Sequence, residues 1–171
     1  MARFTQYPAA SVTDYTDATT FLIANQDGEI KQASLDGLLT NYGCDIRCAS
    51  LTIASADVLK LNSTPLTIVA AQGAGTAIEV ISASASLTYG SVQYATNTIL
   101  HLIATGGNDA QVEWSSVFLS TSSNSIGRSV DVSDKSNLIE NAPLTVSVAT
   151  GNPTAGDSDI TVYVLYRVIT V

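Results

Sequence analysis

Short runs of apolar, β-branched and aromatic residues dominate the chain from about residue 51 onward. Clusters of Gly, Asn, Pro and Ser separate these runs, as in Gln72–Gly75, Ala104–Asp109 and Gly151–Asp157. Apolar runs of this length are typical of β-strands, and the separating residues are typical of turns. The pattern predicts strands at Leu66–Ala70, Ala77–Ser82, Leu87–Tyr89, Ser91–Tyr94, Ile99–Ile103, Val112–Leu119, Leu144–Val148 and Asp159–Val171. Because no helical stretch intervenes, we expect a mainly β protein with an antiparallel sandwich or jelly roll.

The last predicted strand is apolar on both of its faces. One face carries Ile160, Val162, Val164, Tyr166 and Val168, and the other carries Thr161, Tyr163, Leu165, Arg167 and Ile169. A sandwich strand normally turns one face to solvent, so this strand lies either beneath a covering layer or against another subunit. We therefore expect a homo-oligomer, with a strand covered by its own loops as the alternative. The predicted subunit contacts are Tyr163, Leu165, Tyr166, Arg167 and Ile169.

Residues 1–43 follow a different pattern. Two short apolar runs flank an Asp27-Gly28 turn, which predicts a β-hairpin. Ser34 is a helix-capping residue, and Leu35, Leu38 and Leu39 follow at helical spacing. Such a ββα segment is too small to bury its own leucines. It must dock either on the main domain of its own chain or on another protein, and the pattern leaves both open.

The predicted domain organisation has three parts. Residues 1–43 form the N-terminal ββα segment, residues 44–58 form a linker, and residues 59–171 form the β domain.

Composition and charge narrow the possible partners. Only 13% of the 171 residues are charged, 46% are hydrophobic, and 20 Ser and 20 Thr supply a neutral polar surface. This composition excludes intrinsic disorder. The net charge is −8, and the few basic residues are scattered rather than gathered in a stripe. We therefore expect no nucleic-acid partner. No apolar stretch is long enough for a membrane span or a signal core, so we expect no membrane partner and synthesis in a cytoplasm.

The residue types that commonly carry chemistry form no convincing group in the sequence. His101 lies between apolar residues and no Gly-x-Ser-x-Gly elbow is present, which favours a core or interface histidine over a general base. Gly73-Ala74-Gly75 lacks the third glycine and the helix of a dinucleotide-binding loop. Trp114 is expected in the core. We therefore expect no enzymatic activity and no cofactor.

Metal binding is not predicted either. Asp157-Ser158-Asp159 lacks the remaining ligand positions of a calcium loop, and a solvated turn entering the last strand explains it. Cys44 and Cys48 are too few for a four-ligand zinc site. We expect two free thiols, with a local disulfide only in an oxidising compartment.

Two stretches of the chain resemble proteins of tailed-bacteriophage virions. Thr64–Ser82, followed by Leu87–Gly90 and Tyr94, resembles a β domain found in small virion proteins of these phages. The likeness rests on Gly73, Gly75, the strands and Tyr89-Gly90, since Gln72 and Thr76 stand where that pattern has Pro and Lys. Asn152–Asp157 and Val162–Val168 are similar to the closing strand of the same group.

The second resemblance is at the N-terminus. Ala18–Leu39 resembles the segment that attaches phage fibre and tailspike proteins to the particle, with a strand, an Asp-Gly turn and a Ser-Leu-x-x-Leu-Leu helix. This resemblance implies an anchor on residues 1–43 and a trimeric β knob. The implied virion-anchoring residues are Phe21, Ile23, Ile30, Leu35, Leu38 and Leu39.

Together the resemblances imply a structural protein on the surface of a virion, made in the cytoplasm of the host bacterium. We expect a decoration or head-fibre protein attached to the major capsid protein or to another virion protein. The alternative is a short tail fibre or spike that binds a host-cell receptor or glycan. A glycan-cleaving appendage would require paired carboxylates in a cleft. The chain has room for an anchor and a knob but not for a long shaft, which favours the capsid location.

Overall fold

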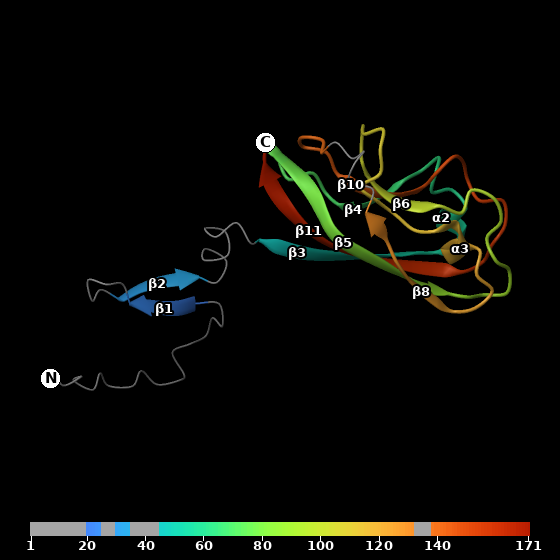
Figure 1. The fold of residues 1–171 in the computed structure, drawn as a ribbon, viewed down its shortest axis with the longest axis horizontal. Coiled ribbons are helices and arrows are strands. Elements are labelled where there is room, and N and C mark those ends of the chain that lie inside the picture. The colour runs from blue at the N-terminus through green and yellow to red at the C-terminus, as the bar shows by residue number, and fades with distance from the viewer. Residues whose placement is uncertain (1–19, 25–29, 35–44, 132–137) are drawn as a thin grey trace. The chain divides into compact units, whose positions relative to one another are not determined.

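A computed structural model of the chain describes residues 20–24, 30–34, 45–131 and 138–171, and it divides into two compact units, residues 1–45 and 46–171 (Figure 1). In the first unit, β1 (Thr20–Ala24) pairs with β2 (Ile30–Ser34) in antiparallel register, with Ala24 opposite Ile30. This pairing is the one expected of a hairpin around Asp27-Gly28. The predicted helix with Leu35, Leu38 and Leu39 lies outside the described residues.

The described residues of the second unit form two antiparallel sheets and two short helices. One sheet has the strand order β4-β10-β6-β7-β9 and the other has the order β3-β11-β5-β8. The elements are β3 (Ile46–Ile53), α2 (Ser55–Val58), β4 (Leu66–Val69), β5 (Thr76–Thr88), β6 (Leu100–Ala104), β7 (Val112–Glu113), α3 (Ser116–Leu119), β8 (Ser125–Arg128), β9 (Val130–Asp131), β10 (Leu144–Val148) and β11 (Asp159–Thr170).

The order of these strands is that of a jelly roll. Apart from the short edge strand β9, each sheet has four strands, and the chain crosses repeatedly from one sheet to the other as it proceeds from β3 to β11 (Figure 1). The first and last strands, β3 and β11, lie side by side, as do β4 and β10. This arrangement is the double-sheet jelly roll, and it confirms the fold class predicted from the sequence.

The core lies between the two sheets and is built from alternate residues of their strands. In β11, Ile160, Val162, Val164 and Tyr166 are at most 8% exposed, and they face the equally buried Leu144, Val146 and Val148 of β10 together with Leu100 and Leu102 of β6. Strands of period two place every second side chain on one face, which is why a single strand supplies a whole row of the core. One apolar face of β11 therefore packs in the core, and the other face points away from the core.

A glycine on β8 makes room for the largest core residue. Trp114 is 1% exposed, and its indole N–H donates a hydrogen bond to the carbonyl of Gly127 at 3.1 Å. A Cβ at Gly127 would lie 2.7 Å from Cδ2 of Phe118 and 3.1 Å from Cδ1 of Trp114. The absence of a side chain at Gly127 therefore allows both aromatic rings to pack beneath β8. The predicted core position of Trp114 is confirmed.

Several strand predictions are wrong, for reasons visible in the structure. The predicted linker, residues 44–58, instead contains β3 and α2, and β3 pairs with β11 along its whole length. Ser91–Tyr94 is not a strand. Its last residue, Tyr94, turns into the core, where its side chain is 1% exposed. The run Val112–Leu119 is divided between β7 and α3, where the Ser115 hydroxyl accepts from the backbone N–H of Val117 and so caps a helical turn.

Candidate functional site

The surface with the most unusual composition is the outer side of the β3-β11-β5-β8 sheet. Residues that are paired across adjacent antiparallel strands share a face, so the printed register defines this surface. Leu165 is paired with Cys48 on one side and Ser82 on the other, and Tyr163 is paired with Ser50 and Ser84. We call this surface the outer face; its residues are Ile46, Cys48, Ser50, Thr52, Glu79, Ser82, Ser84, Ser86, Thr88, Ile126, Arg128, Asp159, Thr161, Tyr163, Leu165 and Arg167.

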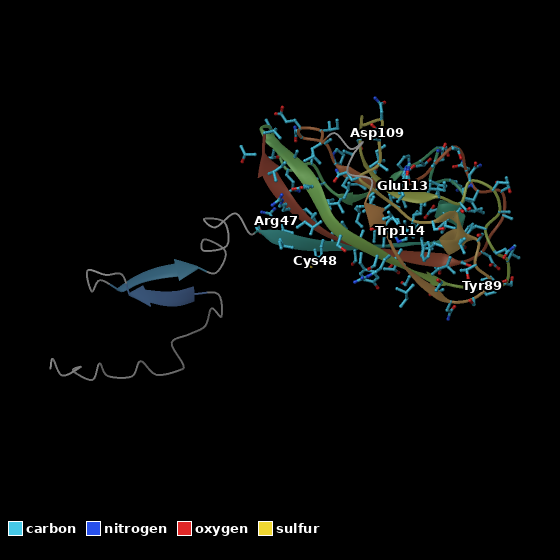
Figure 2. The ribbon with its side chains drawn as sticks, in the orientation of Figure 1. Arg47, Cys48, Tyr89, Asp109, Glu113 and Trp114 are labelled. Atoms are coloured by element: carbon cyan, nitrogen blue, oxygen red, sulfur yellow. The ribbon has the colours of Figure 1, made fainter. Side chains whose placement is uncertain are left out.

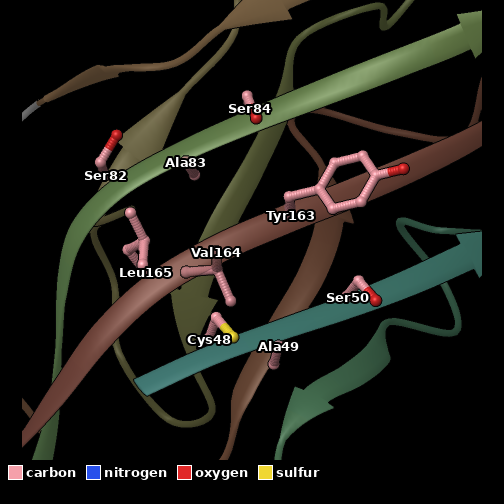
Figure 3. A pocket seen from close by; sticks show the side chains of 9 residues that line it. All are labelled: Cys48, Ala49, Ser50, Ser82, Ala83, Ser84, Tyr163, Val164 and Leu165. Atoms are coloured by element: carbon pink, nitrogen blue, oxygen red, sulfur yellow. The ribbon is translucent and has the colours of Figure 1, made fainter. Parts of the chain in front are cut away.

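The middle of the outer face has a ridge with a trough on either side. Figure 3 shows Tyr163 and Leu165 projecting from β11, with the short side chains of β3 and β5 beside them. The two troughs are low rows of small side chains: Cys48 and Ser50 at the open edge of the sheet, and Ser82 and Ser84 on the inner side of the ridge. The shallow depression around the ridge has a volume of about 280 Å³. The relief arises because two large side chains stand between two rows of small ones.

Four of the ten large apolar side chains that are exposed among the described residues lie on the outer face. Tyr163 is 49% exposed, Leu165 45%, Ile46 58% and Ile126 82%. A single exposed apolar residue is ordinary, but several on one face of a sheet mark a surface suited to contact. The charged residues of the face are Arg128, Asp159 and the ion pair of Glu79 with Arg167. Its middle part, between Ile46 and Ser86, thus consists of apolar and hydroxyl side chains and one thiol.

The structure separates the five residues predicted to form subunit contacts. Tyr163, Leu165 and Arg167 lie on the outer face and are exposed. Tyr166 does not join them, because it falls on the opposite side of β11 and packs in the core at 8% exposure. Ile169 lies near the end of β11, opposite Ala77, and is partly buried. Tyr166 is therefore a core residue, as the alternation of side chains along β11 requires, and it does not belong with the predicted contact residues.

The predicted anchoring residues fall in the first unit. Phe21 and Ile23 are in β1 and Ile30 is in β2, while Leu35, Leu38 and Leu39 lie outside the described residues. Cys44 also lies outside them, and Cys48 is an exposed free thiol on the outer face.

A second depression lies over the other sheet, and it is polar. It has a volume of about 400 Å³ and is lined by Asn62, His101, Asn108, Asp109, Glu113 and Thr150, among others (Figure 2 labels Asp109 and Glu113). His101 of β6 is paired with Glu113 of β7 and with Ser147 of β10, so the three side chains form a row across three strands. Serine, histidine and a carboxylate in a row are the residue types of a hydrolase triad.

The hydrogen bonds of this row do not suit nucleophilic catalysis. The Ser147 hydroxyl is 5% exposed and donates to the carbonyl of Leu61 at 3.0 Å, so its proton is directed away from the imidazole. Burial lowers the pKa of His101, because it disfavours the charged imidazolium, and the nearby Glu113 carboxylate opposes this effect. We conclude that Ser147 fastens β10 to the segment before β4. His101 is partly exposed and lines the depression, so it is not the core residue that was one of the two predictions, and its place in an interface stays a prediction.

In the described part of the chain, the side chains that could bind a metal ion are too far apart, and the buried polar side chains already have partners. No three His, Cys, Asp or Glu side chains within it are grouped closely enough to coordinate a metal. Every buried side-chain nitrogen or oxygen described there has a hydrogen-bond partner. None of the helices described there is long and apolar enough to cross a membrane.

The Asp157-Ser158-Asp159 segment enters the last strand as the sequence predicts, but as an irregular stretch with a buried Ser158 instead of a solvated turn. The Asp157 carboxylate accepts hydrogen bonds from the backbone N–H groups of Ser91 and Val92 and from the Ser91 hydroxyl. These hydrogen bonds, that of the Ser91 side chain above all, lower the pKa of Asp157. Asp159 begins β11, and its carboxylate accepts from the N–H of Ser55. Both carboxylates therefore hold loops together at one end of the sandwich.

Sequence reasoning missed the small residues that shape the outer face. Cys48 and Ser50 were placed in a linker, and Ser82 and Ser84 were not assigned a role. The alternation Ser82-Ala83-Ser84-Ala85-Ser86 is a period-two signal that could have joined the two predicted strands into β5. The position of Cys48, Ser50, Ser82 and Ser84 beside Tyr163 and Leu165, however, depends on how the strands pair, which the local sequence pattern does not specify.

Comparison with known proteins gives one structural likeness. No protein-family model matches the chain, and no curated protein matches it. Among solved structures, a chain of the "Cyanophage Pam1 capsid asymmetric unit" aligns with 18% identity and a TM-score of 0.33, covering 71% of this chain and 84% of that one. A likeness this low establishes neither a common fold nor a common function.

Proposed function

We propose that the chain is a structural protein of a bacteriophage virion, in which residues 46–171 form a knob and the preceding segment attaches it to another virion protein, such as the major capsid protein. The observation that carries this proposal is the division of the chain into a jelly roll and a separate small unit with a two-stranded hairpin. An isolated hairpin is marginally stable at best, so such a unit is suited to docking on a partner.

The jelly roll is compatible with this role without determining it. Double-sheet jelly rolls occur in viral capsid proteins and also in lectins and cupins, so the fold alone does not assign a function. The sequence resemblances narrow the choice, since one part of the chain resembles a β domain of phage virion proteins and another resembles a fibre-attachment segment. The hydroxyl-rich, weakly charged surface suits a protein that is exposed on a particle and makes few charge-specific contacts.

A binding experiment tests the attachment. Particles that lack the protein would be mixed with the purified full chain or with a variant lacking residues 1–43, and bound protein would be measured after sedimentation. We expect the full chain to bind and the shortened chain to stay free. Trp114 fluorescence would verify that the shortened chain is folded, because this single tryptophan lies in the core of the second unit. Equal binding by the two proteins would refute the attachment role.

The location on the virion is tested on the particles themselves. If the chain is a decoration or head-fibre protein, particles without it adsorb to host cells normally and lose resistance to heat or low salt. If it is a short tail fibre or spike, the same particles fail to adsorb and keep their resistance. We favour the first result, because residues 46–171 form a double-sheet jelly roll, an architecture found in viral capsid proteins. The resemblance implies three copies per assembly, which light scattering measures against the chain mass of 17.8 kDa.

A further inference from the structure

The outer face of the β3-β11-β5-β8 sheet lies on the side opposite the core. Both strands that flank β11 contribute small side chains there, so the ridge of Tyr163 and Leu165 stands free (Figure 3). A partner for this face must offer an apolar surface that fits between large and small side chains. Sheets that pack face to face meet this need, because side chains from the two faces interdigitate.

The relief of the outer face is complementary to itself. A two-fold contact uses the same patch on both subunits, so the patch must contain both the projections and the recesses. On this face, the ridge of Tyr163 and Leu165 supplies the projections. The trough of Cys48 and Ser50 and the trough of Ser82 and Ser84 supply the recesses. The ridge of one copy can therefore lie in a trough of the other.

The charges of the outer face are compatible with the binding of a second copy there, unlike those of the rest of the surface. The chain has a net charge of −8, so most contacts between two copies bring carboxylates together. The outer face carries Arg128 and Arg167 together with Glu79 and Asp159, so its two positive and two negative charges cancel. Glu79 and Arg167 already form an ion pair with each other. Packing two outer faces together therefore avoids the repulsion that the rest of the surface would produce.

The outer face is somewhat smaller than the area that a stable contact buries. β3 pairs with β11 over eight residues, which at about 3.3 Å per residue is roughly 26 Å, and four strands at about 4.8 Å span roughly 19 Å. The flat footprint is then about 500 Å² per copy. Two copies would bury roughly 1,000 Å², where specific stable interfaces bury about 1,200–2,000 Å². A contact of this size forms and dissociates with protein concentration.

We propose that two copies of this chain associate through their outer faces, with Tyr163 and Leu165 of each copy packed against the serine and cysteine rows of the other. This contact is independent of the attachment proposed for the N-terminal segment. It joins knob to knob, whereas that segment joins the chain to another virion protein. It is an alternative to the three-copy assembly that the resemblance implies, and a mass of three chains in light scattering would overturn it.

Sedimentation velocity of the full chain over a range of concentrations tests the contact. We expect a Tyr163→Ser/Leu165→Ser variant to weaken the association roughly tenfold or more, because large side chains at the centre of an interface contribute most to affinity. Val117→Ser is the matched control, since Val117 is 68% exposed and lies in α3, outside the outer face. The control should associate as the unmodified chain does. An association unaffected by the double substitution, or a monomer at all concentrations, would overturn the proposal.

The thiol of Cys48 provides a second measurement, since it lies within the contact. In a Cys44→Ser background, the rate at which a bulky maleimide labels Cys48 should fall as protein concentration rises. The same rate should be independent of concentration in the Tyr163→Ser/Leu165→Ser variant. Protection that does not change with concentration would mean that a segment of the same chain covers the face, and labelling that stays rapid would mean that nothing covers it. Either result would overturn the proposal.

Discussion

Replacing Gly156 by alanine tests the packing at the end of the sandwich where loops cross. Gly156 has a φ of +125°, a conformation that L residues rarely adopt, and Tyr94 packs directly against it. A Cβ at this position would lie 2.1 Å from Cδ1 of Tyr94 and 2.4 Å from its Cε1. The ring cannot move freely, because it is 1% exposed and its hydroxyl donates to the carbonyl of Ser158.

The expected loss of stability has two parts. Holding a non-glycine residue at such a φ costs about 1–3 kcal/mol. Forcing an extra methyl group into a packed site costs about 1–3 kcal/mol more. Gly156→Ala should therefore destabilise the second unit by about 2–6 kcal/mol, which is a large share of the stability of a typical domain.

A matched variant separates the two parts. Gly73 has a φ of +109°, and a Cβ there would meet nothing within 4 Å, so Gly73→Ala has the backbone strain without the clash. The difference between the two variants then measures the displacement of Tyr94. Urea unfolding followed by Trp114 fluorescence gives both free energies, because the single tryptophan lies in the core of this unit. Equal destabilisation by Gly156→Ala and Gly73→Ala would show that Tyr94 does not pack against Gly156 as described.

Three further substitutions probe the same unit. Tyr94→Phe removes the buried hydroxyl and leaves the Ser158 carbonyl without its donor, so it should destabilise by about 1–3 kcal/mol in urea unfolding. Gly127→Ala places a Cβ 2.7 Å from Phe118 and should lower the unfolding midpoint and shift the emission of Trp114; an unchanged spectrum would contradict the packing beneath β8. The pKa of Asp157 is lowered from 3.8, so its contribution to stability is present above that pH and is lost as the pH falls through the lower, folded-state value. Unfolding free energies measured across acidic pH should therefore decline less steeply for Asp157→Asn, and identical slopes would show that the carboxylate does not stabilise the fold.

The fold class was predictable because the strands of a sandwich have strong local patterns. β4, β6, β10 and β11 lie within two residues of the predicted runs, since each has apolar residues at every second position and turn residues at its ends. β3 was missed because its inward row begins with Arg47 and Ala49 and its outward row contains Cys48 and Ser50. Such small or polar residues have low strand propensity, and pairing along β11 determines the conformation instead.

The short helix α3 illustrates a different difficulty. Val112–Leu119 is a single apolar run, and a short apolar run fits a buried strand and a buried helical turn equally well. Ser115 and Ser116 mark the change from one to the other, but serine is common throughout this chain. The deciding contact is the packing of Phe118 beneath Gly127, which joins residues from two elements. Long-range packing of this kind is not expressed in the local pattern.

The hydroxyl side chains of the outer face bear on the strength of the proposed contact. A buried hydroxyl is costly unless it finds a hydrogen-bond partner. Thr52 and Thr161 already bond to each other across β3 and β11 at 3.0 Å, so they can be covered without loss. Ser50, Ser82 and Ser84 would need partners from the second copy or from trapped water. The apolar ridge therefore drives the association while the serine rows moderate it. Such a face associates weakly and reversibly, so we expect the contact to form only at high local concentration, as on the virion surface proposed above.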